Sequence, residues 1–172
     1  MLQRVCGRNL VSVFGEQAQL ARAEVIDTTK AEVMSHIARW LQEQNIEATL
    51  NIAPALQQWD WQSFVVHSGP ADENSVVSIT PALCGIAETG TVLCVSGPDT
   101  PTTLNFLPEV HIVLLDKRQI VATYEQAWQR IPFPMPRTAN FITGPSRTGD
   151  IEQTLQFGAH GPKKLVIFLY RA

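Results

Sequence analysis

The sequence predicts one α/β domain with a mainly parallel sheet. Mostly apolar runs of strand length occur at residues 76–79, 92–95, 110–115 and 165–170, and such runs are typical of strands that are buried on both faces. Segments with helical spacing or helix-capping residues alternate with these runs. The chain has 172 residues, 45% of them hydrophobic, so residues 1–172 can bury a core as a single domain.

The first clear element after the N-terminus is a helix. Residues 1–26 mix apolar and polar positions without a clean period, so we expect a poorly determined arm there, either helical or loose. Beyond it, Thr29 and Glu32 have the spacing of a capping box, and Asn45 fits a C-terminal stop. The helix between them is predicted by apolar residues at every fourth position, namely Val33, Ile37 and Leu41.

Short elements are predicted in the next part of the chain. They are a strand at 46–52, a short helix or turn at 54–59, a strand fragment at 64–66, a turn-rich stretch at 67–74 and a strand at 76–79. Trp59 and Trp61 flank Asp60. We interpret both as packing aromatics, with a stacking platform as the alternative.

A short helix is then predicted at residues 80–87, because Pro81 follows Thr80 and proline is favoured at the first helical position. Residues 88–91 end this helix before the buried strand at 92–95, and 96–101 form a loop.

The C-terminal half continues the alternation. A strand at 110–115 is closed by residues 116–118, and Thr123 with Gln126 opens a capped helix that runs to Arg130. Alternating prolines at 131–136 exclude a helix and predict a surface connector, with docking as an alternative role. We expect a strand at 139–142, a helix at 151–157 stopped by Gly158, and a final strand at 165–170.

Composition argues against several classes of protein. The net charge of −3 leaves no basic surface for nucleic acid. No run reaches 18 apolar residues, so we expect no membrane span. The N-terminus has no sustained apolar core with a cleavage site, which argues against a secretory signal and favours a cytoplasmic protein. Nucleotide-binding glycine loops and the nucleophile-elbow motif are absent from the sequence.

The cysteines predict reduced thiols. Cys6, Cys84 and Cys94 are odd in number and widely spaced, which suits a cytosolic protein better than a disulfide framework. Three thiolates cannot complete the usual four-cysteine ligand set, so we expect no iron–sulfur cluster held by this chain alone. We interpret Cys84 and Cys94 as buried small hydrophobes, with redox partners as the alternative. The histidines show no metal-ligand spacing, so no metal site is predicted.

The segment 142–152 is the strongest candidate for a binding loop. Two glycines, a proline and hydroxyl residues lie between an apolar strand and an expected helix, an arrangement that favours an anion at the positive end of the helix dipole. Arg147 adds a planar, permanently charged donor. The alternative is a capped helix start, with Ser146 or Thr148 as N-cap and Asp150 and Glu152 complementing the dipole.

Two segments of the sequence resemble one known family. The run TGPSRTGDIEQTLQFGAHGPKKLVIFLY, residues 143–170, is similar to the C-terminal signature of the lactate-utilisation protein C family, also called the LUD domain. The run GIAETGTVL, residues 85–93, resembles the central motif of that family. The resemblance extends from about Val76 to the end of the chain. It implies a three-layer α/β/α fold, like that of ribose-phosphate isomerases, glucosamine-phosphate deaminases and CoA transferases.

The resemblance also implies a function. Members of this family belong to a multi-subunit, iron–sulfur-dependent system for L-lactate oxidation, in which partner proteins would hold the iron–sulfur clusters. The expected ligand is a small carboxylate, such as lactate or pyruvate, or a phosphate. Two alternatives stay open: a free-standing enzyme of the isomerase or CoA transferase type, and an assembly subunit without chemistry.

The candidate site residues come from both segments. We expect Gly144, Ser146, Arg147 and Thr148 to form an anion pocket that faces Glu88, Thr89, Gly90 and Thr91. Glu88 is the candidate catalytic carboxylate, with fixing of the turn as the alternative. His160 either contacts the same pocket or is an ordinary polar residue with a satisfied partner.

Overall fold

The computed structural model describes residues 9–149, 155–157 and 161–171. Its centre is a six-stranded sheet in which every pair of neighbouring strands is parallel. The strand order is β1 (Glu24–Asp27), β12 (Lys164–Tyr170), β7 (Val110–Asp116), β4 (Val77–Pro81), β2 (Thr49–Ile52) and β3 (Val65–Ser68). The expected mainly parallel sheet is therefore confirmed.

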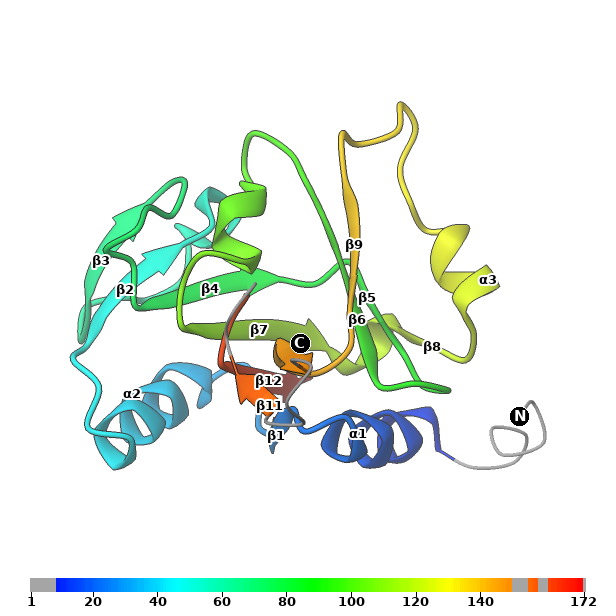
Figure 1. Cartoon of the computed structure of the whole chain (residues 1–172), viewed down its shortest axis with the longest axis horizontal. Coiled ribbons are helices and arrows are strands. Elements are labelled where there is room, and N and C mark those ends of the chain that lie inside the picture. The colour runs from blue at the N-terminus through cyan, green and yellow to red at the C-terminus, as the bar shows by residue number, and fades with distance from the viewer. Residues whose placement is uncertain (1–8, 150–154, 158–160, 172) are drawn as a thin grey trace.

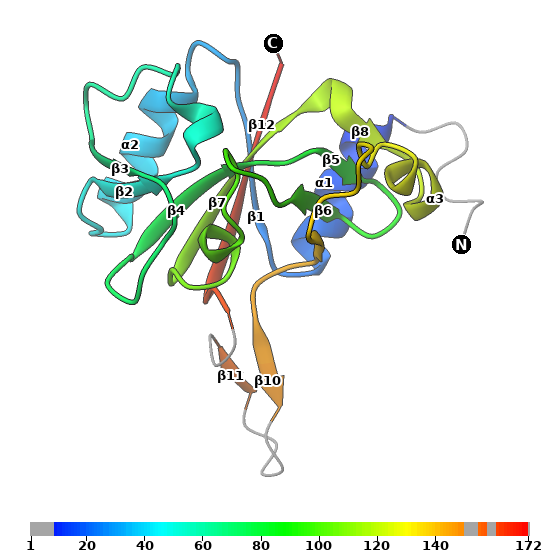
Figure 2. The same cartoon turned by 90° about the horizontal axis from the view of Figure 1, so that it is seen from above.

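The two faces of this sheet pack against different layers. Strand β7 is buried along its whole length, so its alternate side chains enter two separate cores. Ile112 and Leu114 pack with α2 (Val33–Glu43), whereas Val113 and Leu115 pack with α1 (Leu10–Leu20). Figure 2 shows α2 on one side of the sheet and α1 on the other.

Helix α2 forms where the four-residue spacing predicts it. Val33, Ile37 and Leu41 are buried in one core cluster. The capping-box prediction is wrong: Glu32 is the N-cap residue without a side-chain cap, because the Thr29 hydroxyl donates instead to the Glu32 carboxylate at 2.8 Å. The helix ends as expected at Asn45, whose positive φ of 53° turns the chain away.

The N-terminal arm is more regular than expected. Residues 10–20 form α1, whose N-cap Asn9 accepts a hydrogen bond from the backbone N–H of Val11. Phe14 and Ala18 are fully buried beneath the sheet. Of the two alternatives for this arm, residues 10–20 adopt the helical one, because these side chains supply the apolar contacts that hold the helix in place.

A second sheet covers part of the α1 face of the large sheet. Its strand order is β8 (Ile120–Val121), β5 (Cys84–Ile86), β6 (Thr91–Val95) and β9 (Ala139–Ile142). The β5–β6 and β6–β9 pairs are antiparallel, and the β5–β8 pair is parallel. This sheet and α1 form one layer, α2 forms the opposite layer, and the parallel sheet lies between them, which is the expected three-layer arrangement (Figure 2).

The predicted helix at 80–87 is wrong. Thr80 and Pro81 end strand β4, and residues 84–86 form β5. Gly85 lets strand β5 lie close to the core, because glycine has no Cβ atom. A Cβ atom at this position would lie 2.7 Å from Leu115 Cδ2 and 2.8 Å from Phe14 Cε2. The strand passes so close to the core that only glycine is accommodated without a shift of these side chains.

The predicted helix at 151–157 is also wrong where the structure describes it. Leu155–Phe157 is strand β11, and it pairs antiparallel with β10 (Arg147–Gly149). The expected helix stop, Gly158, lies outside the described residues. Figure 2 shows β10 and β11 projecting beyond the main sheet.

The remaining elements are short. Helix α3 (Tyr124–Trp128) begins at the expected cap, where the Thr123 side chain accepts from Gln126 N, but it ends before Arg130. The 3₁₀ turns of the described residues are η2 (Pro54–Leu56), η3 (Thr102–Asn105) and η4 (Lys117–Gln119). The 131–136 connector lies on the surface, with Phe133 96% exposed. Among the described residues, no helix has both the length and the apolar character needed to cross a membrane.

The tryptophans pack as interpreted. Trp61 is buried in the core beside α2, and its ring N–H donates to the Leu56 carbonyl. Trp59 meets Tyr170 edge to face with ring centroids 5.4 Å apart.

Candidate functional site

The hydroxyl groups of four residues meet between the small sheet and α3. Thr91 Oγ1 lies 2.7 Å from Thr89 Oγ1, 3.0 Å from Tyr124 Oη and 2.6 Å from Thr143 Oγ1. Thr91 itself is fully buried. We call Thr89, Thr91, Tyr124 and Thr143 the hydroxyl cluster. Its Thr91–Thr143 hydrogen bond joins residues that are 52 positions apart in the sequence.

The hydroxyl cluster connects the two segments that carry the family resemblance. Thr89 lies in the turn between β5 and β6, Thr91 begins β6, and Thr143 directly follows β9. The antiparallel pairing of β6 with β9 places Val92 opposite Ile142, so the turn and the loop lie at the same end of the pair.

Both segments also approach the last turns of α1 through a glycine. Gly90 has φ +67°, and a Cβ atom there would lie 2.0 Å from the backbone nitrogen of Ala18. Gly144 has φ +72°, and its Cβ atom would lie 2.0 Å from the carbonyl oxygen of Ala21. Any larger residue would strain the backbone and collide with α1. These glycines therefore fix the position of the two loops against the helix.

Glu88 is held at the start of α3. Its Oε1 atom accepts a hydrogen bond of 2.9 Å from the backbone N–H of Tyr124, the first residue of that helix. The residue is half-buried. This bond is the kind expected of a carboxylate that fixes a turn, and it places Glu88 next to the hydroxyl cluster through Tyr124.

The remaining candidates lie along the hairpin that follows. The Ser146 backbone N–H donates to the Pro162 carbonyl, which ties the loop to the segment before β12. Arg147 and Thr148 belong to β10, where only the backbone is described. His160 lies outside the described residues. The structure therefore brings Thr89, Gly90 and Thr91 together with Gly144, and it gives no position for the Arg147 side chain.

Two residues of this region were not identified from the sequence. Tyr124 and Thr143 complete the hydroxyl cluster. Thr143 stands in the candidate loop, directly before Gly144. Tyr124 follows the helix cap Thr123, and it carries no motif that links it to the turn at Glu88. Only the tertiary fold brings it there.

A second set of buried polar groups lies inside the α1 face of the sheet. The Nε2 atom of His111 lies 2.7 Å from the Thr80 hydroxyl, and Cys94 is also buried on this face. Burial lowers the pKa of His111 to about 3 and raises the pKa of Cys94 to about 12. Both groups are therefore uncharged near neutral pH.

The other described cysteine has similar surroundings. Cys84 is buried on β5, and burial raises the pKa of its thiol. Neither Cys84 nor Cys94 forms a disulfide. Both thiols are thus protonated and packed as small apolar groups, as interpreted from the sequence. Among residues 9–149, 155–157 and 161–171, no three His, Cys, Asp or Glu side chains are placed to bind a metal ion.

Comparison with known proteins identifies a family to which the sequence is similar. The family model of the LUD domain matches residues 11–170. An uncharacterized protein of Neisseria meningitidis serogroup B is 34% identical over 163 residues, which are 92% of this chain and 66% of that protein. Lactate utilization protein C of Geobacillus thermodenitrificans is 28% identical over 91% of this chain and 76% of its own length.

A further relative and a solved structure are also similar to this chain. Lactate utilization protein C of Bacillus subtilis is 33% identical over 64% of this chain and 49% of its own length. The chain thus spans only about half to three quarters of these relatives. The crystal structure of a DUF162 family protein from Deinococcus radiodurans superposes with a TM-score of 0.73 at 20% identity, covering 94% of this chain and 96% of that one. The fold is therefore shared, and the chain belongs to the LUD domain family.

Proposed function

We propose that this protein is a component of an iron–sulfur-dependent system for L-lactate oxidation, in which it supplies a small anion-binding pocket and holds no cluster of its own. The observation that carries this proposal is the similarity to proteins named lactate utilization protein C, which extends over 91% of the chain in the Geobacillus thermodenitrificans relative.

The geometry supports a pocket formed by both family segments. The Thr91–Thr143 hydrogen bond of 2.6 Å joins the Glu88–Thr91 turn to the loop that leads into Arg147. Hydroxyl groups donate readily to a carboxylate or phosphate oxygen. Because β10 and β11 replace the expected helix, the charge of Arg147 and these hydroxyls, rather than a helix dipole, would attract the anion.

The protonated, buried cysteines support the proposal that partner subunits hold the clusters and that this chain binds the ligand. Cys84 and Cys94 are buried in protonated form within β5 and β6, so they are poor candidates for cluster ligands. Iron–sulfur partner proteins would therefore carry the electrons, while this chain would bind lactate or pyruvate in the complex.

Reconstitution tests the proposal. The chain is combined with candidate iron–sulfur partner proteins from its source organism, and L-lactate-dependent reduction of an electron-accepting dye is measured with and without this chain. We expect activity only in the complete mixture, and no activity of the chain alone on lactate, sugar phosphates or acyl-CoA. Full activity without this chain would contradict the proposal, and turnover of a sugar phosphate or acyl-CoA by the chain alone would favour the isomerase or transferase alternative.

A further inference from the structure

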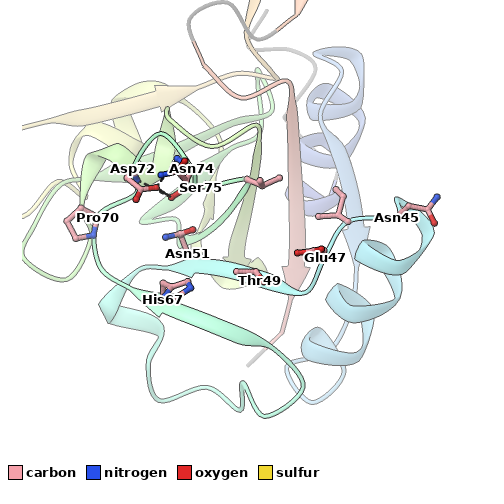
Figure 3. Close-up of a pocket in the computed structure, with 11 residues that line it drawn as sticks. Asn45, Glu47, Thr49, Asn51, His67, Pro70, Asp72, Asn74 and Ser75 are labelled. Atoms are coloured by element: carbon pink, nitrogen blue, oxygen red, sulfur yellow. Dashed lines mark hydrogen bonds between the residues drawn. The ribbon is translucent and has the colours of Figure 1, made fainter.

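A hollow of about 640 Å³ lies on the outer face of β2 and β3, away from the hydroxyl cluster. Figure 3 shows Asn51 and His67 on the neighbouring strands, with Asp72, Asn74 and Ser75 on the loop beside them. The volume is in the range of small-molecule sites. None of its lining residues belongs to the two family segments.

The hollow exists because a strand crossover lacks a helix. Strands β3 and β4 are both parallel to β2, and such connections usually carry a helix that covers the sheet. Here residues 69–76 make the crossover without one. Leu50 and Ile52 are buried in the core with α2, so Thr49 and Asn51 point to the opposite face.

The crossover loop is held in place by its own contacts. The Ala71 backbone N–H donates to Thr103 Oγ1 at 2.9 Å, and Ala71 is buried against η3. The Ser75 hydroxyl and the Asn74 backbone N–H both donate to Asp72 Oδ1 at 3.0 Å. The wall of the hollow is thus formed before any ligand arrives, which reduces the entropy cost of binding.

Several polar groups inside the hollow lack a hydrogen-bond partner among the residues that the structure describes. The side chains of Thr49, Asn51, His67 and Asn74 make no hydrogen bond to any described residue, and neither does Asp72 Oδ2. Asn51 and His67 are register partners on adjacent strands, so their side chains stand next to each other on one face. They offer both donors and acceptors to a ligand.

The charge of the hollow selects among ligands. Its lining includes the carboxylates of Glu47 and Asp72 and no lysine or arginine. The hydrogen bond from Ser75 lowers the pKa of the Asp72 carboxyl, which keeps this group ionised. A carboxylate or phosphate ligand would be repelled, whereas an amine would be attracted.

We propose that this hollow is a second binding site, distinct from the anion pocket, for a neutral or cationic small molecule rich in hydroxyl and amine groups. Asn51, His67 and Asn74 hydrogen-bond the hydroxyl groups, and Glu47 and Asp72 attract the ammonium group. The site is independent of the proposed lactate-linked function.

Three probes with one carbon skeleton test the charge preference. Glucamine, sorbitol and gluconate share a six-carbon polyol chain and carry a positive, no and a negative charge. The full chain, labelled with ¹⁵N, is titrated with each while amide shifts are followed by NMR. We expect saturable shifts at Asn51, His67 and Asn74, with glucamine binding at least threefold more tightly than sorbitol, and gluconate most weakly.

Variants locate the effect. Glu47→Gln should reduce the preference for glucamine over sorbitol, whereas Glu43→Gln, an exposed change on α2 outside the hollow, should leave it unchanged. Asn51→Leu should weaken both probes, with an unchanged melting temperature showing that the fold is intact. Equal or tighter binding of gluconate, shifts centred elsewhere, or no saturable shift with any probe would overturn the proposal.

Discussion

The buried hydroxyl of Thr91 has three oxygen neighbours within 3.0 Å, and it connects an interstrand turn, a helix and a strand end. A hydroxyl carries one proton, so it can donate to only one of these neighbours and must accept from the others. The direction of donation within the cluster can thus change when a ligand oxygen takes one of the protons. Such a cluster suits the binding of an anion beside Gly144.

Replacement of Arg147 tests the anion pocket. A charge-assisted contact contributes about 1.5–3 kcal/mol, so Arg147→Ala should weaken lactate, pyruvate or phosphate binding about tenfold or more, because 1.4 kcal/mol corresponds to a factor of ten. Arg147→Lys should recover only part, since an ammonium lacks the planar fork. Calorimetric titration measures both.

Arg39→Ala, on the exposed face of α2, is the matched control for the loss of one positive charge. Its affinities should equal those of the unmodified chain. If Arg147→Ala lowers the melting temperature and leaves every anion affinity unchanged, the loop is only a structural turn.

His111 should make stability depend on pH in a defined window. Its folded-state pKa of about 3 lies below the ordinary value of 6.5, so the unfolded chain binds more protons between these pH values. Stability is therefore complete above about pH 6.5 and is lost as the pH falls toward 3. The loss between pH 7 and pH 5 should be about 2 kcal/mol.

Urea unfolding at both pH values measures this effect. His111→Gln should remove most of the difference between pH 7 and pH 5, whatever its effect on stability at pH 7. His67→Gln, at an exposed position, should keep the difference. A pH dependence that survives in His111→Gln would assign it to other groups.

Among the secondary-structure elements, the sequence predicts the element type best where the apolar residues follow one clear period. Helix α2 was found because its apolar residues repeat every four positions and all face one core. Residues 80–87 and 151–157 were assigned to helices from a proline and from short apolar spacing. In the structure, part of each segment is a strand: β5 pairs with β6, and β11 pairs with β10. Such pairing depends on residues outside the segment, so a local sequence pattern does not predict it.

Helix α1 could not be distinguished from a loose arm for a related reason. Its buried face is short, because Val13, Phe14 and Ala18 are its buried residues and Gly15, Glu16 and Gln17 stand between them. Contacts with the glycine turns at Gly90 and Gly144 complete its packing. These contacts require positive φ values at Gly90 and Gly144. A glycine in a sequence permits such a value but does not show that the chain adopts it.

Two alanine substitutions separate the roles of glycine at this contact. Gly90→Ala should destabilise the protein by at least about 2 kcal/mol, since the left-handed backbone alone costs a side chain about 1–2 kcal/mol and its Cβ atom would collide with α1. Gly15→Ala, in α1 with no atom within 4 Å of the added Cβ, should stabilise by about 0.5–1 kcal/mol. Urea unfolding measures both, and a neutral Gly90→Ala would show that the turn and the helix are not in tight contact.

For the whole molecule, composition and alternation predicted the fold class correctly. Four apolar runs each became a strand, because the interior of a parallel sheet has few places for polar side chains. The run at 92–95 nevertheless joined the small, mostly antiparallel sheet. Which of the two sheets a buried strand joins depends on the path of the chain between the strands. The composition of the strand does not predict that path.

The metal content of the isolated chain is a whole-molecule prediction. We expect purified protein to contain no stoichiometric iron or acid-labile sulfide, because its two described cysteines are buried and far from a four-thiolate arrangement. Elemental analysis and the visible absorption spectrum measure this. A preparation made together with the iron–sulfur partners should show the cluster absorption, whereas several irons per isolated chain would contradict the prediction.

The strand order has a consequence for biosynthesis. Strand β12 lies between β1 and β7, so a segment translated long after both strands fills the gap between them (Figure 1). Until residues 164–170 leave the ribosome, β1 lacks its neighbour and β7 has an open apolar edge. The large sheet therefore closes only after residues 164–170 have been made, and until then the open edge of β7 can pair with other chains.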